Sequence, residues 1–240
     1  MPAHNFFFYS PDLVSSESTV WLTDDEHFHL ARVLRMEPGD VVRITNGRGL
    51  IVTAEIVTIG AKRTHAQVSR VEDNRPEPVP LVLALGLMPH ARMDAALAQC
   101  VEAGITGWLP IVTERSHVRR VVEGDDPRWT RVAIAAVKQC GRAWLPRLEG
   151  SVDARNVIAK FESFEQVLLA DPDAENLIDI HAAPIPTLAL VGPEGGFTTA
   201  EHERLVAAGA RPVRLSAQRL RAETAAVAIV AMLAANRGRV

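Results

Sequence analysis

The sequence contains no apolar run near the roughly 18 residues that a membrane span requires. Hydrophobic residues make up 48% of the chain and charged residues 23%, a balance typical of soluble globular proteins, so we expect no membrane partner. The first residues lack the basic segment and apolar core of a secretory signal, and we expect a cytoplasmic protein. Only two cysteines occur, Cys100 and Cys140, each within a helical pattern, which favours reduced and packed thiols over disulfides.

Lysine is scarce, whereas arginine is abundant. Of the 26 basic residues only three are lysines, at positions 62, 138 and 160, so 23 are arginines. The net charge of −3 argues against a protein that coats nucleic acid without specificity. The arginines cluster in residues 113–120 and again from Arg211 onward, and their planar guanidinium groups suit phosphates and stacked bases. Codon bias could explain the composition alone, but the clustering favours a polyanionic partner.

Composition changes at "VEDNRPEPVP", residues 71–80, where three prolines alternate with acidic and polar residues. This stretch predicts a linker at 73–80 between an N-terminal domain, residues 1–72, and a larger domain, residues 81–240. Alternating β-branched runs around "NGRG" at 46–49 predict a hairpin in a small β-barrel or sheet. One helix should begin after Thr23 or Asp24. His27 and His29 are two residues apart on it, a spacing that disfavours a shared metal and favours a partly exposed helix start.

Beyond the linker, short apolar runs alternate with helical patterns, which predicts an α/β domain with a mostly parallel sheet. The expected strands are residues 81–87, 108–112, 166–170, 187–191 and 212–215. Amphipathic helices should end at Gly104 and near Gly141. The last helix, residues 222–236, is apolar on nearly every face and too short to cross a bilayer. Either its own domain or a second copy of the chain must bury it.

The loop "LVGPEGGFTTAE", residues 190–201, lacks both common phosphate-binding patterns. It has no Gly-Lys-Ser/Thr ending, and no G-x-G-x-x-G motif follows the first strand of the domain. Glu194 would repel a pyrophosphate, so the ligand of this loop should be neutral or positively charged. A simple strand-to-helix turn would explain Gly195 and Gly196, with Thr198 and Glu201 as a capping box. It would not explain Gly192-Pro193-Glu194, which precede that cap.

The two glycine- and arginine-containing segments near the C-terminus form a specific pair. "VGPEGGFTTAE" followed by "RLSAQRLRAETAA" resembles the paired motifs of SPOUT methyltransferases that modify uridine N3 in 16S ribosomal RNA, the small subunit methyltransferase E family. Segments "FHLARVLRMEPGD" and "RMDAALAQCVEAGITGWLPIVTERS" are similar to upstream parts of the family. Two departures occur: "MPHARMD" lacks a lysine before "RMD", and "SAQRLRAET" lacks the usual Leu-Gly.

The resemblance implies an α/β fold: a SPOUT-type trefoil-knotted parallel sheet with helices on both faces, preceded by a small PUA-like β-barrel. It implies S-adenosylmethionine as cofactor, 16S rRNA or the assembled small subunit as partner, and a homodimer. Cofactor binding is expected at two loops, at Leu190, Val191, Gly192, Pro193, Gly195, Gly196, Leu215, Ser216, Leu220, Ala222 and Thr224. No metal site is expected.

Catalysis and RNA binding are assigned to charged residues. Arg221 would stabilise negative charge on the uracil oxygens, and Glu194 or Glu223 would accept the N3 proton. RNA phosphates are expected at arginines, namely Arg32, Arg35, Arg115, Arg119, Arg120 and Arg142. Two alternatives stay open: an α/β enzyme that uses a phosphate or nucleotide, and an RNA-binding adaptor that has lost catalysis.

Overall fold

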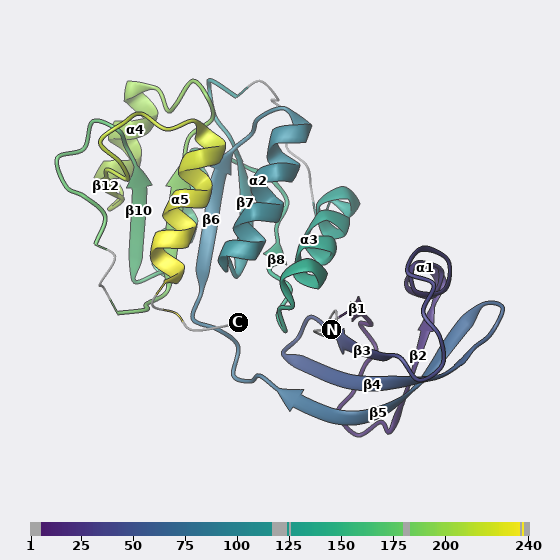
Figure 1. Ribbon diagram of the computed structural model, residues 1–240. Helices are drawn as coiled ribbons and strands as arrows, with labels where there is room; N and C mark the ends of the chain where they lie inside the picture. The colour runs from purple at the N-terminus through teal and green to yellow at the C-terminus, as the bar shows by residue number, and fades with distance from the viewer. Residues whose placement is uncertain (1–5, 117–123, 125, 180–182, 236, 238–240) are drawn as a thin grey trace. The chain divides into compact units, whose positions relative to one another are not determined.

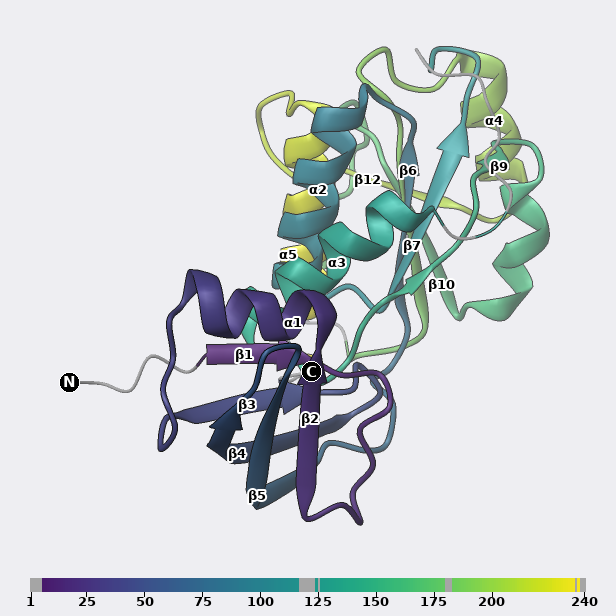
Figure 2. The ribbon, with the colours of Figure 1, turned by 90° about the vertical axis from the view of Figure 1, so that its right-hand side faces the viewer.

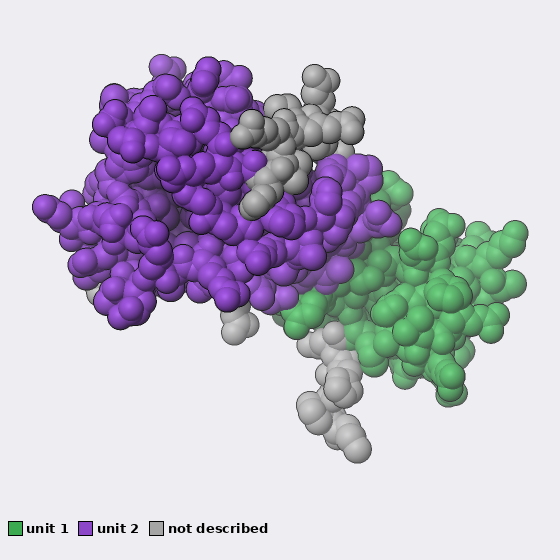
Figure 3. Space-filling view, turned by 90° about the horizontal axis from the view of Figure 1, so that it is seen from above, with its two compact units in different colours: residues 1–77, 137–145, 240 green, residues 78–136, 146–239 purple. Residues whose placement is uncertain are grey.

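The computed structural model describes residues 6–116, 124, 126–179, 183–235 and 237. The described chain forms two compact units (Figure 3). The first holds the residues up to Glu77 together with Val137–Leu145, and the second holds the remainder. The sequence predicts domains at residues 1–72 and 81–240, which places residues 137–145 in the second domain. In the structure these residues belong to the first unit.

The first unit is built on a five-stranded sheet in the order β1-β3-β4-β5-β2. The strands are β1 (Phe6–Tyr9), β2 (Thr19–Thr23), β3 (Val41–Thr45), β4 (Leu50–Ile59) and β5 (Arg63–Asp73). β1 pairs with β3 in parallel and the other pairs are antiparallel. The β3–β4 hairpin turns at "NGRG", as predicted, with positive φ at Gly47 and Gly49. There the Asn46 side chain accepts hydrogen bonds from the backbone of Arg48 and Leu50.

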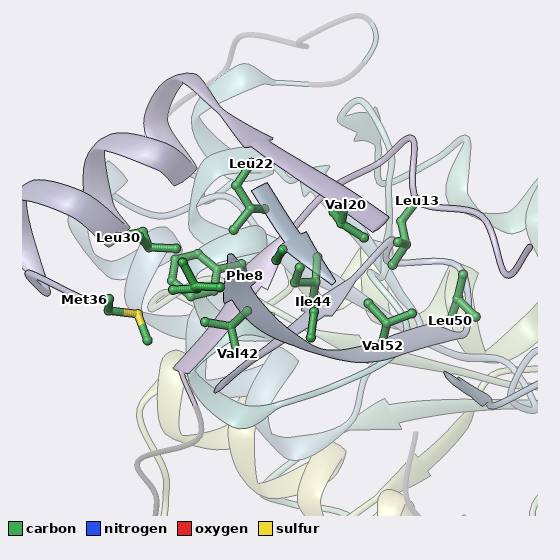
Figure 4. Packing of buried hydrophobic residues seen from close by; sticks show 13 residues of the cluster. Phe8, Leu13, Val20, Leu22, Leu30, Met36, Val42, Ile44, Leu50 and Val52 are labelled. Atoms are coloured by element: carbon green, nitrogen blue, oxygen red, sulfur yellow. The ribbon is translucent and has the colours of Figure 1, made fainter. Parts of the chain in front are cut away.

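Period-two alternation builds the core of this unit. In β3, Val42 and Ile44 point inward against Phe8 and Val52 (Figure 4). The helix begins after Thr23, as α1 (Asp24–Phe28), and continues through a π-helical turn, His29–Val33. His27 is only 9% exposed, and its Nδ1 lies 2.9 Å from Thr64 Oγ1. The expectation of a partly exposed start is therefore wrong for His27, because α1 packs on β5.

Residues 137–145 join the first unit through side-chain and backbone contacts. Lys138 Nζ lies 2.7 Å from Glu26 Oε1, and Thr45 Oγ1 donates to the Ala143 carbonyl. Trp144 Nε1 donates to the carbonyl of Asn74. Residues 74–80, within the expected linker, form no helix or strand, whereas β5 continues to Asp73.

The second unit contains a parallel sheet in the order β12-β10-β11-β6-β7-β8, with β9 also paired to β7. The strands are β6 (Leu81–Gly86), β7 (Gly107–Val112), β8 (Arg147–Leu148), β9 (Val152–Asp153), β10 (Gln166–Ala170), β11 (Thr187–Val191) and β12 (Arg211–Val213). All five predicted strands are present, within one or two residues at their ends. Their nearly continuous apolar sequences agree with burial on both faces of a parallel sheet.

Helices cover both faces of this sheet (Figures 1 and 2). One face carries α2 (His90–Ala103) and α5 (Ala222–Ala234), which pack on each other. On the other, Leu205 of α4 (Thr199–Ala207) and Phe161 of the 3₁₀ helix Val157–Ser163 pack in one apolar cluster with β11. A further helix, α3, spans Pro127–Cys140. No helix in the described ranges is long and apolar enough to cross a membrane.

Three sequence predictions about the helices have different outcomes. α2 ends at Gly104, where φ is +111°, as expected. Cys100 is buried in α2, but Cys140 at the end of α3 is exposed, so only the first thiol is packed. α5 buries Ala222, Ala226, Ile229 and Val230 within its own unit, and the expected contact of this helix with a second copy stays a prediction.

Candidate cofactor site

A cavity of about 680 Å³ opens at the carboxyl ends of β10, β11 and β12. This is where ligands bind in open parallel sheets, and the volume is typical of small-molecule sites. The lining residues come from four segments of the chain. They are Arg115, residues 170–173, residues 191–199 with His202, and residues 215, 216, 218–222 and 225. All of these residues belong to the second unit.

The glycine-rich loop is folded tightly on itself and against the end of β6. A Cβ on Gly192 would lie 3.1 Å from backbone atoms of Gly196. A Cβ on Gly86 would lie 2.3 Å from the backbone nitrogen of Pro193. The Gly196 amide donates to the Pro193 carbonyl at 2.8 Å, and Gly196 has φ +67° with open space around its missing Cβ. The loop thus presents bare backbone to the cavity, for which glycine is required.

The loop that follows β7 clamps this glycine-rich loop. Arg115 Nη1 donates to the carbonyls of Gly195 at 2.8 Å and Phe197 at 3.3 Å. The carboxylate of Glu201, only 4% exposed, accepts from the backbone of Glu114 at 2.9 Å and of Thr198 at 2.9 Å. Thr198 and Glu201 also form the predicted capping box of α4. The expected contact of Arg115 with RNA phosphate stays a prediction, and the structure adds that Arg115 Nη1 binds two carbonyls of the glycine-rich loop.

Glu194 lies at the cavity wall in an ion pair. Its Oε1 is 2.9 Å from Nη1 of Arg92, which is in the first turn of α2. Arg92 is the arginine of "ARMD", the segment in which the expected lysine is missing. Although this segment lacks the lysine, its Arg92 still brings a positive charge to the glycine-rich loop. Arg92 and Glu194 are 102 residues apart in the sequence.

Asp171 and His202 form a second polar pair in the cavity that the sequence analysis missed. His202 Nε2 lies 2.9 Å from Asp171 Oδ2, and Asp171 Oδ1 accepts the backbone N–H of Asp173. A carboxylate directly after β10, next to the glycine-rich strand end, is the one signal that could have indicated it. The pair presents an oriented imidazole and a carboxylate to a ligand.

The other two candidate catalytic residues, Arg221 and Glu223, are in different settings. Arg221 lies immediately before α5 and lines the cavity. No ion pair joins Arg221 to Glu223 within the part of the chain that the structure describes. Glu223 is in the first turn of α5 and outside the cavity lining, and its Oε2 is buried with no hydrogen-bond partner among the described residues. The positive end of the helix dipole favours a carboxylate at that position.

Most of the expected cofactor residues line the cavity, and two do not. Leu190 is fully buried in the apolar cluster beneath α4, so it supports the site from behind. Thr224 is exposed on α5 and outside the lining. The remaining nine form the wall, namely Val191, Gly192, Pro193, Gly195, Gly196, Leu215, Ser216, Leu220 and Ala222.

The other arginines assigned to RNA have mixed outcomes. Arg32 and Arg35 are exposed on the first unit. Arg119 and Arg120 lie outside the described residues. Arg142 is only 5% exposed, and burial lowers the pKa of its guanidinium to about 10. That burial argues against a phosphate contact by Arg142.

Two family descriptions match the chain: an RNA methyltransferase domain over residues 75–234 and an RNA methyltransferase PUA domain over residues 22–69. The ribosomal RNA small subunit methyltransferase E of Mycobacterium bovis is 30% identical over 231 residues, covering 91% of this chain and 87% of that protein. The chain belongs to the ribosomal RNA small subunit methyltransferase E family. It is therefore an RNA methyltransferase, which decides against a nucleotide-using enzyme and an inactive adaptor.

Solved structures agree with the family and with the predicted fold class. The ribosomal RNA small subunit methyltransferase E from Neisseria gonorrhoeae, bound to S-adenosyl methionine, is 28% identical with a TM-score of 0.84, covering 95% of this chain and 96% of that one. A probable rRNA-methyltransferase from Porphyromonas gingivalis is 31% identical with a TM-score of 0.78, covering 96% and 98%. The trefoil knot itself stays a prediction.

Proposed function

We propose that the cavity binds S-adenosylmethionine and that the enzyme methylates N3 of a uridine in 16S ribosomal RNA. The observation that carries this proposal is the cavity wall, which combines bare glycine backbone with charges of both signs. Carboxylates of Asp171, Asp173 and Glu194 and the guanidinium groups of Arg219 and Arg221 all line it. A cofactor with a sulfonium, an ammonium and a carboxylate fits such a wall better than a polyphosphate does.

The loop geometry supports the same cofactor. The open space at the missing Cβ of Gly196 leaves room for an adenosine group beside the backbone, and the close approach of Gly192 to the Gly196 backbone holds the loop compact. When bound, S-adenosylmethionine supplies an electrophilic methyl group. The Neisseria relative, which was solved with this cofactor, makes the proposal stronger because it covers nearly the whole chain.

Arg221 is the residue that we assign to charge stabilisation. Uracil N3 must lose its proton before it can attack the methyl group, and the resulting negative charge spreads onto the two carbonyl oxygens. A guanidinium beside these oxygens would stabilise the anion as it forms. Arg221 lines the cavity and is not paired with Glu223 among the described residues, so its guanidinium can serve this role.

The proton acceptor is assigned to Glu194 or Glu223. Glu194 is at the cavity wall, but its Oε1 is engaged by Arg92. Glu223 has a buried oxygen that has no hydrogen-bond partner in the part of the chain that the structure describes, yet Glu223 lies outside the cavity lining. Glu194 is the better placed of the two, because a base must reach within hydrogen-bond distance of the proton that it removes.

The finer partners are also proposals. We infer a cytoplasmic homodimer in which α5 contributes to the interface, because apolar residues of this helix, including Val227 and Leu233, are only partly buried within the unit. The substrate is 16S rRNA, free or within the assembled small subunit. Light scattering would test the dimer, and methylation of purified 16S rRNA compared with small subunits would identify the substrate.

Two experiments test the function itself. Purified protein should be thermally stabilised by S-adenosylmethionine and by its demethylated product, and not by ATP. In cells that lack the gene, mass mapping of small-subunit RNA should show loss of one 3-methyluridine. Retention of every 3-methyluridine would rule out the proposed reaction even if the cofactor binds.

A further inference from the structure

The outer face of β2 and β5 in the first unit carries an exposed tryptophan, Trp21, next to a histidine and an arginine. Trp21 is directly opposite His65 in the antiparallel register, and Thr23 is opposite Arg63. Their neighbours Leu22 and Thr64 are buried on the opposite face. Because side chains alternate along a strand, Trp21, Arg63 and His65 share the outer face.

These three side chains form a stack. The Trp21 and His65 ring centroids are 4.5 Å apart with an interplanar angle of 24°. Arg63 Cζ lies 4.2 Å from the centre of the Trp21 ring. Even so, Trp21 is 45% exposed, whereas Trp108 and Trp129 are buried. Trp21 is thus held by two neighbours while almost half of the residue stays exposed, so the stack as a whole offers a preformed planar surface to a flat ligand.

We propose that the Trp21–Arg63–His65 stack binds an unpaired base of the RNA substrate. Aromatic rings and guanidinium planes are the groups on which proteins stack single-stranded bases. The exposed charges nearby are of both signs, with Lys62 and Arg63 positive and Asp24 and Glu55 negative. Because the acids would repel a run of phosphates, the mixed charges favour an uncharged base at this surface. The inference rests on the proposed RNA substrate and concerns a site separate from the cofactor cavity, which lies wholly in the second unit.

The rival explanation is a cross-strand pair that only stabilises the sheet, since aromatic pairs of this kind contribute to sheet stability. The two explanations differ in what happens to RNA binding. Trp21→Ala, in the full-length protein, should weaken binding of a short single-stranded oligouridine by about tenfold or more. Binding of a duplex RNA of the same length should not change, because paired bases are not available for stacking. The salt dependence should also stay the same, since no phosphate contact is lost.

Trp21→Phe and Phe28→Ala complete the design. Trp21→Phe keeps a ring and should retain most of the oligouridine affinity. Phe28 is 60% exposed on α1, whose His27 packs on Thr64 at the opposite face, so Phe28→Ala removes an exposed aromatic elsewhere and should leave binding unchanged. If Trp21→Ala does not fold, tryptophan fluorescence decides: oligouridine should quench the wild-type protein more than the Trp21→Phe variant.

Clear results would overturn the proposal. Equal oligouridine affinity in wild type and Trp21→Ala, with a lower melting temperature, would leave only the sheet-stabilising pair. Equal quenching in wild type and Trp21→Phe, or no binding of oligouridine by the wild type, would also refute it. Cofactor-induced thermal stabilisation and nucleoside mapping judge the methyltransferase function independently, so the two failures can be told apart.

Discussion

Glu201→Gln tests whether the buried carboxylate of α4 holds the cofactor loop. Glu201 Oε1 accepts from the Glu114 amide, and Oε2 accepts from the Thr198 amide and hydroxyl. Glutamine is nearly the same shape, but one of its two terminal atoms is an NH₂ donor. In either orientation of the glutamine amide, its NH₂ group would face the backbone N–H of Glu114 or of Thr198. That N–H would lose its acceptor.

The magnitude follows from these contacts. A buried donor left without an acceptor costs about 1–3 kcal/mol. Loss of a negative charge in the first turn of a helix adds about 0.3–1 kcal/mol. The free energy of unfolding of the second unit should therefore fall by roughly 2–3 kcal/mol. Affinity for S-adenosylmethionine should fall as well, because Glu114 precedes Arg115, which holds the carbonyls of Gly195 and Phe197.

Urea unfolding and calorimetric titration with S-adenosylmethionine measure the two effects. Glu203→Gln is the matched control, since Glu203 is exposed on the same helix. Equal stability of the two variants would refute the clamp. Reduced stability of Glu201→Gln with unchanged cofactor affinity would show that the clamp is structural and is not coupled to the cavity.

Three further predictions concern Gly196, Arg221 and the two cysteines. Gly196→Val should abolish cofactor binding and should also cost about 1–2 kcal/mol of stability, because the φ of Gly196 is +67°. Gly196→Asn should keep more of the stability, because asparagine tolerates this φ better than valine, but calorimetric titration should still show a loss of cofactor affinity. Arg221→Ala should lower single-turnover methylation on the order of a hundredfold with cofactor affinity retained, and normal methylation at saturating RNA would exclude the catalytic role. Burial raises the pKa of Cys100 to about 12, so iodoacetamide should label exposed Cys140 in the native protein; mass spectrometry showing Cys100 labelled first would contradict this burial.

The features that the sequence predicted well are local ones. The strands of the second unit follow from short apolar runs, the end of α2 from Gly104, and the cap of α4 from Thr198 and Glu201. Each of these depends on residues within a few positions of one another. The glycines of the cofactor loop belong to the same class, because a bare backbone is a property of the loop itself.

The features that the sequence could not predict depend on distant segments. Arg115 resembles an RNA-binding arginine in its local sequence, and only the fold brings it to the carbonyl of Gly195, 80 residues away. The Asp171–His202 pair and the inclusion of residues 137–145 in the first unit have the same origin. A charged side chain can be assigned a chemical type from sequence, but its partner is fixed by tertiary structure.

Side chains that follow two separate strand ends hold the glycine-rich loop. Arg92, beyond β6, fixes the Glu194 carboxylate, and Arg115, beyond β7, fixes the carbonyls that flank Gly196. Gly86 at the end of β6 admits Pro193 at a distance that no Cβ would allow. A loop held in this way loses little conformational entropy when a ligand binds, so more of the contact energy is available as affinity. Loss of either arginine should therefore weaken cofactor binding without removing a direct contact to the reacting methyl group.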